Sequence, residues 1–190
     1  CCHPALVPLD AAKKVKTSAK LEQLMALLPE MLAEGRRILL FSQFTSMLTL
    51  IEAELKKRGL PWVKLTGQSV KRDAIIEQFT SGQVPLFLIS LKAGGVGLNL
   101  PQADTVIHFD PWWNPAVENQ ATDRAHRIGQ AQSVWVVKLV AQGTIEERIL
   151  ALQERKAQLA GSLYSEAAAR KEPLFTESDL AELLQPLSSL

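Results

Sequence analysis

The chain has 190 residues and a mass of 20.9 kDa, enough for one compact core of roughly 150 residues plus extensions. Its 47% hydrophobic and 22% charged content excludes a chain that is disordered throughout. The net charge of +1 excludes a general attraction to polyanions, so any nucleic-acid surface must come from local clustering of basic side chains. The two cysteines are adjacent at the N-terminus, which excludes a disulfide framework and a four-cysteine zinc site.

Helical and strand-like apolar patterns alternate along the chain. In chain order they predict a helix over residues 21–35, a strand over 37–41, a helix over 44–57, a strand over 62–65, a helix over 71–79, strands over 86–90 and 105–109, a helix over 115–127, a strand over 134–139 and a helix over 144–158. This alternation predicts an α/β fold in which helices cover both faces of a parallel sheet.

The two ends of the chain differ from this pattern. Residues 1–18 have little periodicity and are expected to form a linker, so residues 19–160 are predicted to form the domain. Residues 161–190 hold two basic against five acidic residues and one helical stretch at 178–184, which predicts a C-terminal helical extension. The longest uncharged runs, such as residues 38–51, are about fourteen residues, too short to span a membrane, so no membrane partner is expected.

Phosphate-binding groups follow three of the predicted strands. In open α/β sheets, ligands bind beyond the carboxyl ends of the strands, where hydroxyls and exposed backbone N–H groups suit phosphate oxygens. The residues at these positions are Ser42, Gln43, Thr66, Gly67, Ser90 and Lys92. The glycines in residues 94–97 permit close backbone approach to a ligand, although a tight turn is the alternative explanation for them.

The run QATDRAHRIGQ at residues 120–130 is the strongest local signal. On a helix, Gln120, Arg124 and Arg127 are spaced i, i+4 and i+7 and share one face, with Gly129 ending the helix. Two guanidiniums on one face suit the charge of a γ-phosphate in a transition state. The alternative is a solvated basic face, or salt bridges from the arginines to Asp123 and Glu118.

Residues 20–149 resemble the second RecA-like lobe of the Swi/Snf-type ATPases, the DNA-translocating branch of the superfamily two helicases. Four segments carry the resemblance: residues 38–44 resemble motif IV, residues 65–68 with Arg72, Ile76 and Phe79 resemble the segment after it, residues 90–100 resemble motif V, and residues 120–130 resemble motif VI. Cys2-His3-Pro4 resembles the end of the Cys-x-His-Pro segment that precedes this lobe, so His3 is interpreted as structural. Leu91 departs from the pattern, because many superfamily members have Thr there.

The resemblance implies a role for each motif. It implies that Gly95, Gly97, Asn99 and Gln120 face the nucleotide and that Arg124 and Arg127 reach its γ-phosphate across an interlobe cleft. It implies that Ser42, Gln43, Thr66, Gly67, Ser90 and Lys92 contact the DNA backbone. No metal ligand is expected. Trp112 and Trp113 are interpreted as packing residues, with base stacking as the alternative, His108 as a core residue, and His126 as a hydrogen-bonding residue.

The sequence contains neither a G-x-x-x-x-G-K-S/T run nor an adjacent Asp–Glu pair. These groups cradle phosphates and hold Mg²⁺ in such enzymes, so the chain is expected to be half of an active site and inactive as an ATPase alone. ATP and Mg²⁺ would be held mainly by a first lobe. The leading hypothesis is the second motor lobe of a double-stranded DNA translocase; a lobe of a strand-separating helicase and a non-catalytic docking module are the alternatives.

The expected partners are the backbone of duplex DNA, an N-terminal RecA-like lobe of the same polypeptide and a DNA-bound protein that is remodelled. The helix at residues 144–149 and its continuation through Lys156 resemble bacterial members of the family. A bacterial protein would lie in the nucleoid, within the cytoplasm, and a eukaryotic one in the nucleus.

Overall fold

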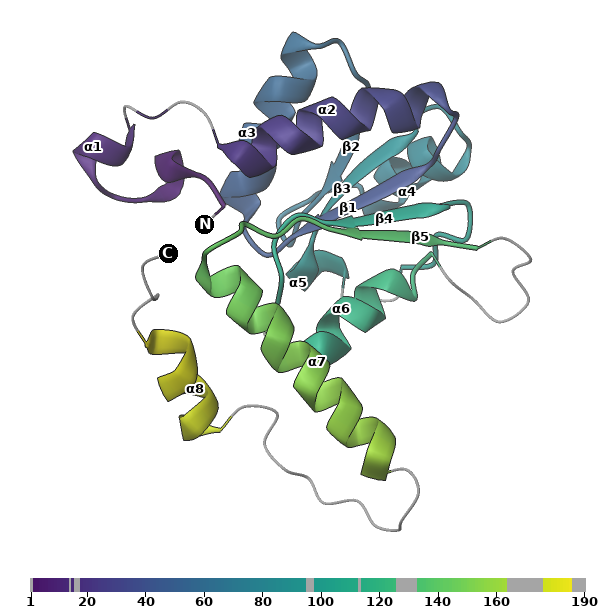
Figure 1. Ribbon diagram of the computed structural model, residues 1–190. Coiled ribbons are helices and arrows are strands. Elements are labelled where there is room, and N and C mark those ends of the chain that lie inside the picture. The colour runs from purple at the N-terminus through teal and green to yellow at the C-terminus, as the bar shows by residue number, and fades with distance from the viewer. Residues whose placement is uncertain are drawn as a thin grey trace.

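The computed structural model describes residues 2–13, 15, 18–94, 98–112, 114–125, 133–163 and 176–185. The helices are η1 (Pro4–Leu6), α1 (Asp10–Lys13), α2 (Ala19–Ala33), α3 (Thr45–Lys57), α4 (Arg72–Thr80), α5 (Leu91–Gly94), α6 (Pro115–Thr122), α7 (Ile145–Leu163) and α8 (Glu177–Leu184). The strands are β1 (Ile38–Ser42), β2 (Val63–Leu65), β3 (Leu86–Ser90), β4 (Thr105–His108) and β5 (Trp135–Lys138). Figure 1 shows a central sheet with helices on both of its faces.

The five strands form one parallel sheet in the order β2-β3-β1-β4-β5. Each predicted strand lies within one residue of its observed bounds at both ends. Strands β1, β3 and β4 are buried along their whole length, as expected for parallel strands covered on both faces. The predicted fold class is therefore confirmed.

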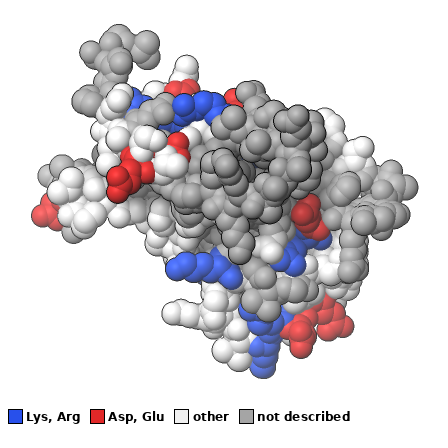
Figure 2. Space-filling view, turned by 90° about the horizontal axis from the view of Figure 1, so that it is seen from below, with Lys and Arg blue, Asp and Glu red and all other residues white. Residues whose placement is uncertain are grey.

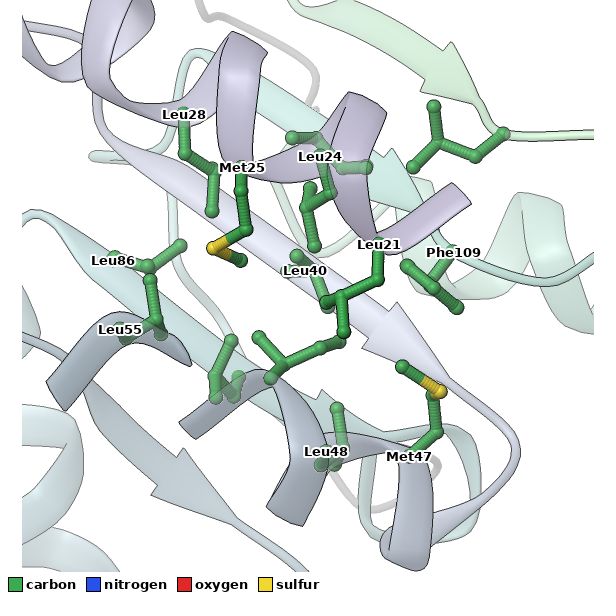
Figure 3. Packing of buried hydrophobic residues seen from close by; sticks show 14 of the residues in the cluster. Leu21, Leu24, Met25, Leu28, Leu40, Met47, Leu48, Leu55, Leu86 and Phe109 are labelled. Carbon is green, nitrogen blue, oxygen red and sulfur yellow. The ribbon is translucent and has the colours of Figure 1, made fainter. Parts of the chain in front are cut away.

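Successive residues of β1 enter two different cores. Ile38 and Leu40 pack with α2 and α3, as Figure 3 shows for Leu40. Leu39 and Phe41 point to the opposite face, where α4, α5 and α6 contribute buried side chains. This alternation follows from the two-residue repeat of a strand, and it makes each core a sheet face covered by helices.

Glycines end α2 and α3. Gly35 has φ +81° and Gly59 has φ +66°, which is the left-handed conformation that other residues adopt at a cost. After α3, the Leu60 N–H donates to the Leu55 carbonyl and the Gly59 N–H donates to the Lys56 carbonyl, the two bonds of a Schellman motif. The local sequence thus determines where α2 and α3 end.

The first residues pack onto the domain more closely than their lack of periodicity suggests. Cys2 and His3 are buried, and the imidazole Nδ1 of His3 accepts a hydrogen bond from the Ala5 N–H at 3.0 Å. Ser18 caps the start of α2 and also donates to the Cys2 carbonyl at 2.9 Å. These bonds confirm the structural role of His3, while the domain boundaries at residues 18 and 160 stay predictions.

Helix α6 is shorter than predicted. The expected helix over residues 115–127 ends at Thr122, and residues 123–125 form a turn. Tertiary bonding explains the difference, because the Leu100 N–H donates to the Arg124 carbonyl at 2.9 Å and diverts the backbone from the helix axis.

Helix α7 begins at Ile145, near its predicted start, and α8 packs against it. Within the described parts of the chain, no helix has the length and apolarity of a membrane span.

Candidate nucleotide and nucleic-acid site

The parallel strands bring three of the predicted phosphate-binding segments to one edge of the sheet. Ser42 and Ser90 are partners in the register of β1 and β3, and Leu65 at the end of β2 lies beside Ile89. The residues that follow these strand ends therefore meet at the carboxyl edge, where ligands bind in open α/β folds.

A polar hollow of about 440 Å³ lies at this edge, and we call it the strand-end hollow. Nine of its ten lining residues carry a hydroxyl, amide or ammonium group. The lining residues are Gln43, Thr45, Ser46, Thr49, Lys64, Thr66, Gly67, Gln68, Ser90 and Lys92. Five of the six residues predicted to contact a DNA backbone are thus side by side, in a surface rich in hydrogen-bond donors.

The first two turns of α3 form a wall of this hollow that contains none of the predicted site residues. Thr45 and Thr49 are spaced i, i+4, so they lie on one face of the helix, and Ser46 lies beside them. A signal for them was present, because three hydroxyl residues occur within five positions directly after the motif IV resemblance.

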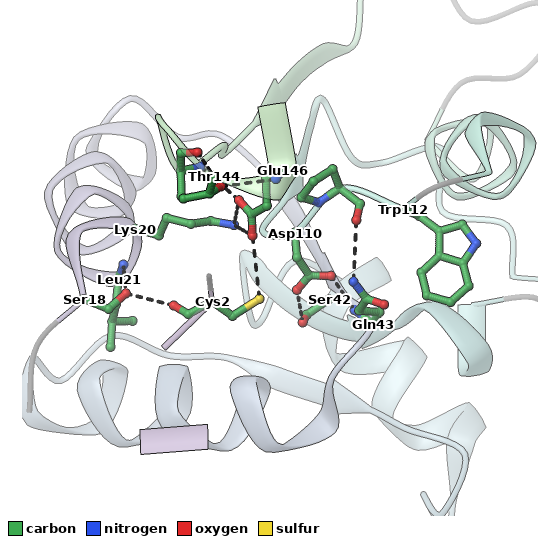
Figure 4. A network of polar contacts seen from close by, with 12 residues as sticks. Cys2, Ser18, Lys20, Leu21, Ser42, Gln43, Asp110, Trp112, Thr144 and Glu146 are labelled. Carbon is green, nitrogen blue, oxygen red and sulfur yellow. Dashed lines mark hydrogen bonds and ion pairs between the residues drawn. The ribbon is translucent and has the colours of Figure 1, made fainter. Parts of the chain in front are cut away.

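Ser42 is brought to the same edge but does not line the hollow. Its side chain is 0% exposed, and its hydroxyl donates to the Asp110 carboxylate at 2.5 Å. The Gln43 N–H donates to the other oxygen of Asp110 at 2.9 Å, so this carboxylate holds the end of β1 (Figure 4). The expectation of a direct phosphate contact from the Ser42 hydroxyl is therefore corrected to a supporting role, because the strand buries that side chain. Burial raises the pKa of Asp110, against the lowering effect of these two hydrogen bonds.

The two lysines of the hollow differ in their surroundings. Lys64 lies 2.5 Å from Glu52, whose other carboxylate oxygen accepts from the Trp62 indole N–H at 2.9 Å. Lys92 is exposed on α5, next to Ser90, whose hydroxyl accepts from the Ala93 N–H at 3.3 Å. In the described part of the face shown in Figure 2, basic and acidic side chains lie next to one another, in keeping with the small net charge. Lys92 is thus an exposed cation available to a polyanion at this edge.

Arg124 lies against the end of the motif V resemblance. One guanidinium nitrogen donates to the Leu98 carbonyl at 3.2 Å, and the Arg124 carbonyl accepts from Leu100. Asn99, between these two residues, is exposed, and so is Gln120 on α6. The structure therefore brings Arg124 and Asn99 together, although they are 25 positions apart in the sequence.

The shared helical face of Gln120, Arg124 and Arg127 is not observed. Because α6 ends at Thr122, Arg124 lies in the turn after it, where its guanidinium bonds to the Leu98 carbonyl. Arg127, Gly95 and Gly97 lie outside the described residues, as do Trp113, His126 and Gly129. Glu118, one alternative salt-bridge partner for the arginines, pairs with Lys138 at 2.8 Å. Trp112 is partly buried against the core, which confirms its interpretation as a packing residue.

His108 ends β4 beneath α6. It is 1% exposed, its ring stacks on Phe41 with centroids 5.7 Å apart, and its Nε2 lies 3.1 Å from the Thr122 hydroxyl. Burial lowers its pKa to about 4; Glu118 opposes this shift and Lys138 adds to it. His108 is therefore a neutral core residue, as predicted.

A buried ion pair lies beside the bonds of Asp110 with Ser42 and Gln43 in Figure 4. Lys20, in the first turn of α2, contacts both carboxylate oxygens of Glu146 at 2.8 and 3.0 Å, and its ammonium lies 4.9 Å from the Phe109 ring centroid. The pair joins the starts of α2 and α7.

Burial raises the pKa of the neighbouring Cys2 thiol to about 12, so this thiol stays protonated. Among the described side chains, no group of three or more His, Cys, Asp and Glu could hold a metal ion.

Comparison with known proteins identifies relatives of this chain. The model of the helicase conserved C-terminal domain matches residues 19–129. The putative ATP-dependent helicase/translocase YwqA of Bacillus subtilis is 44% identical over 84% of this chain and 18% of its own length. The chain spans about a fifth or less of the curated relatives it matches. Relatives at 40–44% identity come from bacteria, a fungus, a plant and the mouse, so a bacterial origin stays a prediction.

Solved structures show the same fold. The SWI2/SNF2 ATPase core of Sulfolobus solfataricus in complex with double-stranded DNA is 37% identical, with a TM-score of 0.67, covering 85% of this chain and 34% of that one. The isolated C-terminal domain of a SWI2/SNF2 ATPase from the same organism is 32% identical, with a TM-score of 0.68, covering 98% of this chain and 76% of that one. The chain therefore belongs to the helicase conserved C-terminal domain family, as a RecA-like C-terminal lobe of the SWI2/SNF2 type.

Proposed function

We propose that this chain is the second motor lobe of an ATP-dependent translocase or remodeller that moves on double-stranded DNA. The observation that carries the proposal is the strand-end hollow, where Gln43, Thr66, Gly67, Ser90 and Lys92 meet. Hydroxyl, amide and ammonium donors are the groups that hold nucleic-acid phosphates without reading base sequence. The related SWI2/SNF2 core solved with double-stranded DNA supports a duplex as the partner.

The nucleotide side of the lobe supplies donors to a triphosphate held elsewhere. Arg124 and Asn99 lie together, and Gln120 is exposed nearby in sequence, so these three residues suit phosphate and ribose oxygens. The reaction is hydrolysis of ATP, and both ATP and Mg²⁺ would be held mainly by an N-terminal RecA-like lobe. In this reading Arg124 and Arg127 are the arginine fingers, and Gly95 and Gly97 let the backbone approach the nucleotide.

Salt-dependent DNA binding tests the first half of the proposal. The 190-residue chain should bind duplex DNA weakly, without sequence preference, and at least as well as single strands. Each neutralised phosphate contributes about −0.9 to the slope of log K against log salt, so Lys92→Ala should make that slope less negative by about 0.9. Lys56→Ala is the matched control, because Lys56 is exposed in the last turn of α3, outside the hollow. Affinity that survives high salt or depends on base sequence would instead favour a docking module with direct readout.

Turnover tests the second half. The chain alone should not hydrolyse ATP above the rate in buffer, whereas the two-lobe protein, in which this lobe is joined to one that carries a P-loop, should do so with DNA. In the two-lobe protein, Arg127→Ala and Arg124→Ala should each lower turnover on the order of a thousandfold and spare most of the DNA affinity. Arg127→Lys should restore little, because lysine lacks the planar fork. Wild-type turnover in both alanine variants, with only a lower melting temperature, would make the arginines structural.

A lobe of a strand-separating helicase is the second candidate function, because several relatives are named as ATP-dependent helicases. Displacement of a third strand from a triplex without unwinding of a labelled duplex would support translocation, and unwinding of the duplex would support the helicase. A DNA-bound protein as the target, and a location in the bacterial nucleoid or the eukaryotic nucleus, belong to this same proposal.

A further inference from the structure

Helix α6 buries one charged side chain and few apolar ones. Among its described side chains, Glu118 is 2% exposed and Ala121 is the buried apolar residue, with Val117 partly buried. Arg124 follows the end of this helix by two residues. The contacts that fix the orientation of α6 therefore also constrain the position of Arg124.

Three side chains form a compact cluster around the first half of α6, and we call it the α6 hub: Glu118 of α6, Lys138 of β5 and Gln153 of α7. One carboxylate oxygen of Glu118 accepts from the Gln153 amide at 3.0 Å, and the other lies 2.8 Å from the Lys138 ammonium. That ammonium is also 3.4 Å from the side-chain amide oxygen (Oε1) of Gln153. Each member thus contacts the other two.

The hub also grips the backbone that leads into α6. The Trp112 N–H donates to Glu118 at 2.6 Å, and the Gln153 amide donates to the Trp112 carbonyl. At the other end of α6, the Thr122 hydroxyl lies 3.1 Å from His108. The helix is therefore held at both ends by directional bonds, which fix its orientation more narrowly than apolar contact does.

Helix α7 provides a firm base for these bonds. Gln153 is 4% exposed, and it lies seven residues after Glu146, so both side chains leave the same face of α7. Glu146 is anchored by the buried pair with Lys20. The face of α7 that carries Gln153 is thus tied to the domain at two points.

We infer that Glu118 and Gln153 are positioning residues for Arg124. This inference rests on the proposed function, in which Arg124 stabilises the transition state of ATP hydrolysis. Neither side chain touches the nucleotide in this scheme; they set the register of α6 against β5 and α7. A misplacement of about 1 Å in such a group can cost a hundredfold in rate.

The test uses the two-lobe protein, with turnover measured at saturating ATP and DNA. Gln153→Leu keeps the volume but removes the amide, and Glu118→Gln keeps an acceptor but removes the charge paired with Lys138. Each should lower kcat on the order of ten- to a hundredfold and leave the KM for ATP and the KM for DNA within about twofold, because the arginines act mainly in the transition state. Glu154→Gln is the matched control, since Glu154 is the exposed neighbour of Gln153 on α7.

Two further variants separate positioning from stability. The exchange Glu118→Gln with Gln153→Glu places a carboxylate near Lys138 again and should recover part of the lost kcat. Gln153→Leu should add little to Arg124→Ala, because both act through one segment. A fall in melting temperature with unchanged kcat, or equal effects of Gln153→Leu in both backgrounds, would overturn the inference. Wild-type turnover in Arg124→Ala and Arg127→Ala would instead overturn the proposed function.

Discussion

Acidification should unfold this domain partly through His108. The pKa of His108 is lowered from 6.5 to about 4 in the folded protein, chiefly because the imidazole is buried. Below pH 6.5 the unfolded chain binds a proton at this residue, and the folded chain does so only near pH 4. The unfolded state therefore binds more protons within this window, so stability is full above pH 6.5 and falls as the pH falls.

The size of the effect follows from the shift. At 1.36 kcal/mol for each pKa unit, the complete loss across the window is about 3 kcal/mol, and the loss at pH 5 is about 2 kcal/mol. Such a change is a large share of the 5–15 kcal/mol by which domains are typically stable. Glu118 raises the pKa of His108 and Lys138 lowers it, so desolvation of the imidazole, the largest cause, decides that the pKa falls.

The assay is urea unfolding of the chain followed by circular dichroism between pH 4.5 and 7.5. His108→Gln is the comparison variant, because glutamine can still bond to the Thr122 hydroxyl but does not titrate. Carboxylates titrate in both proteins, so the difference between the two stability curves isolates His108. Wild type should lose about 2 kcal/mol more than the variant between pH 7 and pH 5. Parallel curves would show that His108 is not held neutral by burial.

Three sets of substitutions test the stability of the domain, each by chemical denaturation. Lys20→Met should cost about 3–5 kcal/mol because it leaves Glu146 buried without its cation, and adding Glu146→Leu should recover most of the loss; an equal loss in the double variant would contradict this account. Leu24→Ala, at a fully buried position of α2, should cost about 2–5 kcal/mol, and the half-buried Leu27→Ala should cost clearly less. Gly59→Ala should cost about 1–2 kcal/mol because φ is +66° there, whereas no change would mean that the turn relaxes freely.

The sequence by itself determined the sheet and most of its helices. Apolar runs such as residues 38–41 and 86–89 are typical of strands covered on both faces, and local glycines at positions 35 and 59 end two of the neighbouring helices. The rule that ligands meet the carboxyl ends of such strands then placed Gln43, Thr66 and Lys92 at one edge. These features depend on short-range periodicity and on the fixed handedness of parallel connections, which a sequence records directly.

Only the tertiary structure decided the positions that depend on contacts between distant segments. Helical spacing put Arg124 on a helix, but the loop at residues 98–100 captures its backbone and guanidinium, so α6 ends earlier. Ser42 has the right residue type for phosphate, yet Asp110, 68 residues away, takes its hydroxyl. The contact between Glu118 and Gln153 gave no signal in the sequence, because a buried polar cluster has no period along the chain. Hydrogen bonds between segments far apart in sequence settled each of these positions, and they form only once the sheet has brought those segments together.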